Sequence, residues 1–253
     1  MKRISIYCLL IFCVLLTASA QQTKQLVILH TSDTHSRIEP IDPHAADRYA
    51  GMGGVVRRAT FLKDFRAGNP DVLLFDCGDI SQGTPYYNLF QGEVEVKMMN
   101  LMGYDAMTIG NHEFDFGLDN MARLFRMADF PVVCANYDVT GTVLERLVKP
   151  YVVLNRDGMK IGVFGLSPKM EGLVQADKCE GVVYNDPIAA AQEVTDRLRA
   201  QEGCDVVICL SHLGFRIKNE VCDEKLAAET KGIDVILGGH SHTFMEKPAF
   251  YLN

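Results

Sequence analysis

Seven residues with metal-binding side chains each follow a short apolar segment of the chain. They are Asp33, His35, Asp79, Asn111, His212, His240 and His242. Imidazole favours zinc, iron or manganese, whereas carboxylate and amide oxygens suit manganese or magnesium. The mixture of ligand types therefore suits a pair of divalent metal ions. One carboxylate can bridge two ions, and we expect Asp79 to do so because it stands alone on its loop.

The apolar segments before these residues have the length and composition of β-strands, and helical segments separate them. We expect strands at residues 26–29, 72–75, 106–109, 132–134, 151–154, 160–166, 206–210 and 235–237. Apolar residues at helical spacing predict helices at residues 53–66, 93–102, 118–125, 187–198 and 223–230. Asp157-Gly158 predicts a hairpin turn. This α/β order predicts a layered fold in which the loops after the strands meet in one crevice.

A single histidine after a strand is more often a surface or core residue than a metal ligand. We interpret His30 and His44 in that way. The other five of the seven histidines all lie in loops after strands, beside acids, glycines or asparagine. Because chance rarely produces such a pattern, we interpret these loops as one metal centre.

Five short motifs together resemble those of calcineurin-like metallophosphoesterases. They are Asp-x-His at 33–35, Gly-Asp at 78–79, Gly-Asn-His-Glu-Phe-Asp at 110–115, Ser-His-Leu-Gly at 211–214 and Gly-Gly-His-Ser-His at 238–242. Residues 29–37 and 110–117 resemble the 5′-nucleotidase family in particular, which includes periplasmic nucleotidases and UDP-sugar hydrolases. The resemblance implies the layered α/β metallophosphoesterase fold. Mixed β-sheets would be flanked by helices, with the metal site at the carboxyl ends of strands.

The resemblance also implies a role for each site residue. Asp33, His35, Asp79 and His242 would hold one metal ion, and Asp79, Asn111, His212 and His240 the other. His112 and Asp115 would form the catalytic pair, with Asp115 orienting the imidazole. The sequence agrees, because His112 directly follows Asn111 and must face the same crevice. The imidazolium would stabilise charge on the phosphoryl group or protonate the leaving oxygen, while a hydroxide bridging the two metals attacks in line.

The activity that the resemblance implies is metal-dependent hydrolysis of phosphate esters. The expected substrates are nucleoside 5′-monophosphates or related nucleotides. Two alternatives stay open: a cyclic-nucleotide or diphosphate phosphodiesterase on the same centre, and a non-catalytic metal-binding subunit of a split two-chain nucleotidase. The ions could be zinc, manganese, iron or magnesium, and the sequence does not choose among them.

The first 20 residues have the three parts of a secretory signal peptide. Met1-Lys2-Arg3 is positive, residues 4–16 are apolar, and small residues end at Ala20. A membrane-spanning helix needs about 20 apolar residues, so we expect cleavage after Ala20, a periplasmic or secreted protein, and no stable membrane anchor. Cleavage would change the net charge from −7 to −9, because two basic residues leave without an acid. An acidic chain without a basic run is not expected to bind nucleic acid.

Six cysteines would remain after cleavage. Cys77, Cys134 and Cys209 lie in strand-like runs, where buried thiols are expected. The other three are Cys179, Cys204 and Cys222, and at most one disulfide is expected among them. No Cys-x-x-Cys spacing occurs, so a thiolate zinc site is not indicated.

Residues 21–253 are interpreted as one metallophosphoesterase domain. Nucleotidases of the family carry a second, C-terminal domain with arginines for the phosphate and aromatic rings for the base. This chain reaches Asn253 soon after His242, so we expect that domain to be absent and the first domain to end early. A separate chain could then supply the substrate domain as a partner. Otherwise the enzyme would accept simpler phosphate esters, or the chain would be a remnant.

Overall fold

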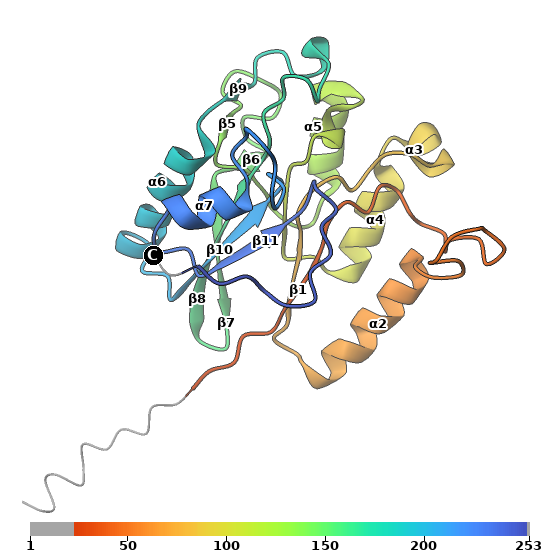
Figure 1. Cartoon of the computed structure of the whole chain (residues 1–253), viewed down its shortest axis with the longest axis horizontal. Helices are drawn as coiled ribbons and strands as arrows, with labels where there is room; N and C mark the ends of the chain where they lie inside the picture. Colours follow the sequence, from red (N-terminus) through yellow and green to blue (C-terminus); the bar gives the residue numbers. More distant parts are fainter. Residues whose placement is uncertain (1–22, 252–253) are drawn as a thin grey trace, which may run out of the picture.

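Two β-sheets pack face to face, and helices cover their outer faces (Figure 1). The structure is a computed structural model that describes residues 23–251. The predicted signal peptide, residues 1–20, lies outside the described residues. Within residues 23–251, no helix has both the length and the apolar character that crossing a membrane requires.

The first sheet contains five parallel strands in the order β1-β2-β3-β4-β6. Their bounds are Ile28–Thr31 for β1, Leu73–Asp76 for β2, Ala106–Thr108 for β3, Val132–Val133 for β4 and Val148–Lys149 for β6. Parallel neighbours need crossover connections, and helices provide most of them. These helices are α2 (Val55–Gly68), α3 (Pro85–Phe90), α4 (Glu93–Met102) and α5 (Gly117–Met127), with a 3-10 turn, η1, at His112–Phe114.

The second sheet has the order β11-β10-β8-β7, with β7 antiparallel and the others parallel. Its strands are β7 (Tyr151–Arg156), β8 (Met159–Leu166), β10 (Val206–Ser211) and β11 (Val235–Gly238), accompanied by α6 (Pro187–Ala200) and α7 (Asp223–Glu229). Asp157 and Gly158 close the β7–β8 hairpin with φ values of 46° and 66°. Both residues have left-handed backbone conformations, and aspartate and glycine tolerate these better than most residues, so an Asp-Gly turn suits this hairpin.

Three short elements complete the described fold. The strands β5 (Tyr137–Asp138) and β9 (Val183–Tyr184) pair with each other, and η2 spans Ala176–Lys178. Tyr137 of β5 packs against Phe114 of η1, with ring centroids 5.8 Å apart. The seven predicted ligands themselves follow strands of the two larger sheets.

The side chains of β10 show how the layers are built. Ile208 and Leu210 pack between the two sheets, whereas Val207 and Cys209 pack on the side covered by α6. Both faces of the strand are thus buried, as expected for parallel sheets under helices. In Figure 1, α2, α4 and α5 lie on one side of the sheets and α6 and α7 on the other.

The predicted α/β class, with mixed sheets flanked by helices, is confirmed. The strands β1 and β2 begin two residues and one residue later than predicted, and β8 begins one residue earlier. The strands β5, β6 and β9 and the helix α3 were not predicted. All six cysteines at residues 77–222 are free, which agrees with the expectation of at most one disulfide. The prediction that His30 is an ordinary core or surface residue also fits, because it lies exposed on the edge strand β1.

Candidate metal centre

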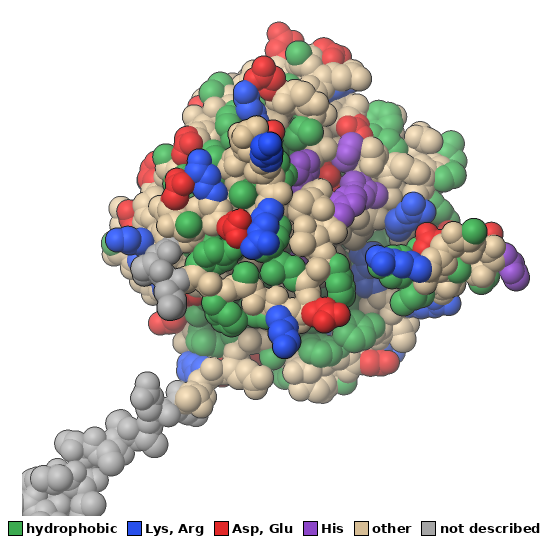
Figure 2. Space-filling model, in the orientation of Figure 1, with side chains coloured by type: hydrophobic (Ala, Val, Ile, Leu, Met, Phe, Trp, Pro, Cys, Tyr) green, Lys and Arg blue, Asp and Glu red, His purple; other side chains and the backbone are tan. Residues whose placement is uncertain are grey.

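The seven predicted ligands lie in loops that follow β1, β2, β3, β10 and β11. These are the carboxyl ends of parallel strands in both sheets, and they meet at one edge of the molecule. Figure 2 shows most of the histidine side chains gathered on this face, close to acidic groups. The stacking of two sheets is therefore what brings residues far apart in the chain into one site.

Asp33, His35 and His242 form the first group of side chains that could hold a metal ion. One ligand atom from each lies within 4.8 Å of the others. The two Nε2 atoms of His35 and His242 are 3.1 Å apart, and His242 Nε2 is 3.4 Å from Asp33 Oδ1. Three potential ligands thus converge on one small volume.

Asp79, His212 and His240 form the second group, with the same mutual spacing. Nδ1 of His212 donates to the carbonyl oxygen of Cys77, which leaves Nε2 to face the site. That Nε2 is 3.0 Å from Asp79 Oδ2 and 3.8 Å from Asp33 Oδ1. The two groups are therefore adjacent, and a carboxylate at their boundary could serve both.

Buried polar atoms without a hydrogen bond test whether metal ions fit this site. Among the described residues, two of these atoms are His35 Nδ1 and Asn111 Oδ1. Both belong to predicted ligands, and each would cost free energy if it stayed without a partner. The nitrogen and oxygen donors fit divalent ions, although the donor set does not identify the metal.

The backbone of the ligand loops is in the left-handed region (positive φ), which residues other than glycine rarely adopt. The residues with positive φ include Asp33 at 50°, His35 at 42°, Asp79 at 57°, His240 at 69° and His242 at 48°. A left-handed residue other than glycine costs about 1 kcal/mol or more. Five of the seven predicted ligands carry this cost, which the surrounding contacts must offset.

Glu113 supplies such contacts, and sequence reasoning gave it no role. Its carboxylate is buried and accepts N–H groups from Asp79 at 3.0 Å, Ile80 at 2.9 Å and Gly110 at 2.5 Å. One side chain thereby joins the loop of Asp79 to the loop of Asn111. Burial, followed by the charge of Asp79, raises the pKa of Glu113 to about 7. The position of Glu113 inside the Gly-Asn-His-Glu motif is the sequence feature that could have indicated this role.

Replacing Glu113 with glutamine should destabilise the chain by about 2–4 kcal/mol, because an amide cannot accept all three N–H groups and its own N–H₂ opposes one of them. Urea unfolding of the metal-free protein measures this. Glu95→Gln is the matched control, since Glu95 is also buried and neither of its oxygens has a hydrogen-bond partner. Equal losses in both variants would contradict the role of Glu113 as a clamp.

Asp79 and His212 form a strongly interacting pair. Burial acts to raise the pKa of Asp79, but the contact with His212 and its positive charge outweigh burial and lower the pKa to about 2. Burial acts to lower the pKa of His212, yet Asp79 raises it to about 9. Binding of a metal ion by His212 must therefore displace a proton at neutral pH.

His112 and Asp115 lie beside the first ligand group. Nδ1 of His112 is 3.0 Å from Asp115 Oδ2, and the His112 ring is 5.5 Å from the His35 ring. The hydrogen bond to Asp115 raises the pKa of His112, which favours the imidazolium form. With Nδ1 engaged by Asp115, Nε2 is the ring atom left for a substrate.

Residues 26–244 match the family of calcineurin-like phosphoesterases, and the chain belongs to this family of hydrolases. Among curated relatives, a snake venom 5′-nucleotidase from Gloydius brevicauda is 36% identical over 240 residues, covering 92% of this chain and 40% of that protein. The 5′-nucleotidase of Bos taurus is 35% identical over 228 residues, covering 87% and 38%.

The solved structures agree with the sequence relatives. A 5′-nucleotidase precursor from Thermus thermophilus has a TM-score of 0.78 and 35% identity, covering 86% of this chain and 42% of that chain. The NAD nucleotidase of Haemophilus influenzae has a TM-score of 0.76 and 31% identity, covering 88% and 44%. The predicted resemblance to 5′-nucleotidases is confirmed. The chain spans about 40% of the length of the curated relatives it matches.

Proposed function

We propose that this chain hydrolyses phosphate monoesters, with nucleoside 5′-monophosphates or related nucleotides as the preferred substrates. The observation that carries the proposal is the pair of adjacent ligand groups, at Asp33 and at Asp79, with the His112–Asp115 pair beside them. The 5′-nucleotidase relatives support the choice of substrate class. Residues 21–253 would form one catalytic domain.

The proposed chemistry assigns a task to each part of the site. Asp33, His35, Asp79 and His242 would hold one divalent ion, and Asp79, Asn111, His212 and His240 the other. When bound, such ions would supply a nucleophile by lowering the pKa of a water molecule and would neutralise charge on the phosphoryl oxygens. His112 donates its Nε2 proton to the phosphoryl group or to the leaving oxygen, while Asp115 holds the ring through Nδ1.

Selectivity for a nucleotide would depend on groups beyond the matched region of the relatives. We propose that these groups lie on a longer form of this chain or on a separate chain that carries a C-terminal nucleotidase domain. A relative from Bacillus subtilis, 32% identical, is a trifunctional nucleotide phosphoesterase, so a diester also belongs among the test substrates. Export, predicted from residues 1–20, fits a relative found in venom.

The test is hydrolysis of AMP, 4-nitrophenyl phosphate and bis(4-nitrophenyl) phosphate by the chain without residues 1–20. Each assay contains added manganese or zinc, and a parallel assay contains a chelator. We expect metal-dependent release from the two monoesters, with AMP preferred. Preference for the diester would favour the phosphodiesterase alternative. A folded, metal-loaded chain that hydrolyses none of the three would overturn the proposal and favour a non-catalytic subunit.

A further inference from the structure

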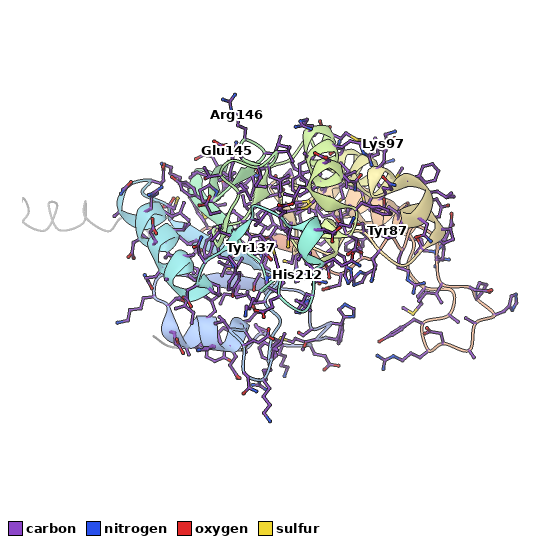
Figure 3. All side chains as sticks on the ribbon, turned by 90° about the horizontal axis from the view of Figure 1, so that it is seen from above. Tyr87, Lys97, Tyr137, Glu145, Arg146 and His212 are labelled. Atoms are coloured by element: carbon purple, nitrogen blue, oxygen red, sulfur yellow. The ribbon has the colours of Figure 1, made fainter. Side chains whose placement is uncertain are left out.

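Tyr87 is a buried tyrosine whose hydroxyl reaches the His112–Asp115 pair. It lies on α3 and is 9% exposed. Its hydroxyl donates to Asp115 Oδ2 at 2.7 Å, and the same oxygen is 3.0 Å from His112 Nδ1. One carboxylate oxygen therefore accepts from both side chains. Figure 3 shows Tyr87 on the α3 side of the molecule, to one side of His212.

The position of Tyr87 is fixed by its own neighbours. Its ring packs against Phe116, with ring centroids 4.9 Å apart. The helix α3 begins directly after Thr84, whose hydroxyl donates to the backbone oxygen of Ser36 at 3.0 Å. Ser36 follows His35 in the loop of the first ligand group. The hydroxyl of Tyr87 is thus held by an element that is tied to the candidate metal centre.

Asp115 needs a second fixed partner because it is accessible to solvent. Its side chain is 32% exposed, and that of His112 is 25% exposed. A carboxylate with one hydrogen bond and open access to water can rotate away from its partner. The hydroxyl of Tyr87 opposes this rotation. Burial, followed by the hydrogen bond to Asp115, raises the pKa of Tyr87, so the hydroxyl keeps its proton.

We propose that Tyr87 is a positioning residue that fixes Asp115, so that Asp115 in turn holds the His112 ring with Nε2 directed at the leaving group. This inference rests on the proposed function. No covalent step involves Tyr87. The contribution of Tyr87 should be largest for substrates whose leaving oxygen needs a proton. A poorly aligned His112 imidazolium would protonate that oxygen more slowly.

The variant Tyr87→Phe removes only the hydroxyl and keeps the ring contact with Phe116. The preceding residue offers a matched control, since the Tyr86 hydroxyl donates to Glu39 at 2.7 Å at the surface. We expect Tyr87→Phe to lower kcat on AMP about ten-fold, with little change in KM, while Tyr86→Phe behaves as wild type. On 4-nitrophenyl phosphate, whose leaving group needs little protonation, the loss should stay below about three-fold.

A double-mutant cycle distinguishes positioning from a general loss of structure. If Tyr87 acts through Asp115, adding Tyr87→Phe to Asp115→Ala should cause no further loss of kcat. Wild-type kcat in Tyr87→Phe would overturn the inference. Equal losses on both substrates that add to the loss from Asp115→Ala would overturn it as well.

A nuclear magnetic resonance measurement keeps this test independent of turnover. In the metal-loaded chain, the Nδ1–H signal of His112 should weaken in Tyr87→Phe and persist in Tyr86→Phe. An unchanged signal in Tyr87→Phe would refute the positioning role even if the chain hydrolysed no ester. An inactive wild type with the expected signals would instead refute the proposed function alone.

Discussion

Replacing Asp79 with asparagine should remove at least one metal ion and lower turnover by about a thousand-fold or more. Asp79 Oδ2 lies 3.0 Å from His212 Nε2, and Asp33 Oδ1 of the other ligand group lies 3.8 Å from the same nitrogen. A neutral amide cannot supply the negative charge that a bridging ligand needs. Loss of several kcal/mol of charge stabilisation in the transition state corresponds to about a thousand-fold in rate.

The fold should survive this substitution. Asp79 Oδ1 accepts the backbone N–H of His112 at 2.8 Å, and the amide oxygen of asparagine can accept the same bond. Metal content is measured by elemental mass spectrometry, and turnover is measured on AMP. Asp119→Asn, at an exposed position on α5, is the control for the change in net charge. Two bound ions and more than about a tenth of wild-type turnover in Asp79→Asn would contradict the proposed bridging role.

The assembly of the ligand loops could be predicted from sequence because each loop follows a strand. Parallel strands of one sheet end at one edge, so the loops of Asp33, Asp79 and Asn111 had to be neighbours. The contribution of β10 and β11 depended on a second sheet stacked on the first. The backbone N–H of His240 donates to Asp33, 207 residues away in the chain, and local patterns do not reveal such a contact.

The contacts that hold the loops could not be predicted in the same way. Left-handed backbone, as at His35 and His242, is uncommon for any residue other than glycine, so sequence patterns alone do not predict it. Tyr87 lies 28 residues before Asp115, on a six-residue helix without a clear apolar period. Glu113 is an acid in the interior, which composition rules place on the surface. The contacts of Tyr87 and Glu113 join segments about 30 residues apart in the chain, and local sequence patterns do not reveal contacts at that separation.

Replacing His112 with alanine should leave the metal content unchanged and lower turnover on AMP by roughly a hundred- to ten-thousand-fold. No ligand role is proposed for this ring, which is held by Asp115 and packs edge-on against His35. His44→Ala, at an exposed loop position, is the matched control and should retain wild-type turnover. Turnover and metal content are measured on the same preparations.

The dependence on pH gives this prediction a direction. The hydrogen bond to Asp115 raises the pKa of His112, so the imidazolium form persists to a higher pH than in an unperturbed histidine and is lost as the pH rises through that pKa. If the protonated ring is the donor, wild-type kcat should fall on the alkaline side of the profile, and His112→Ala should lack that fall. Added imidazole should restore part of the lost rate, because it can enter the space left by the ring. An alkaline fall that persists unchanged in His112→Ala would assign the titration to another group and remove His112 from the role of proton donor.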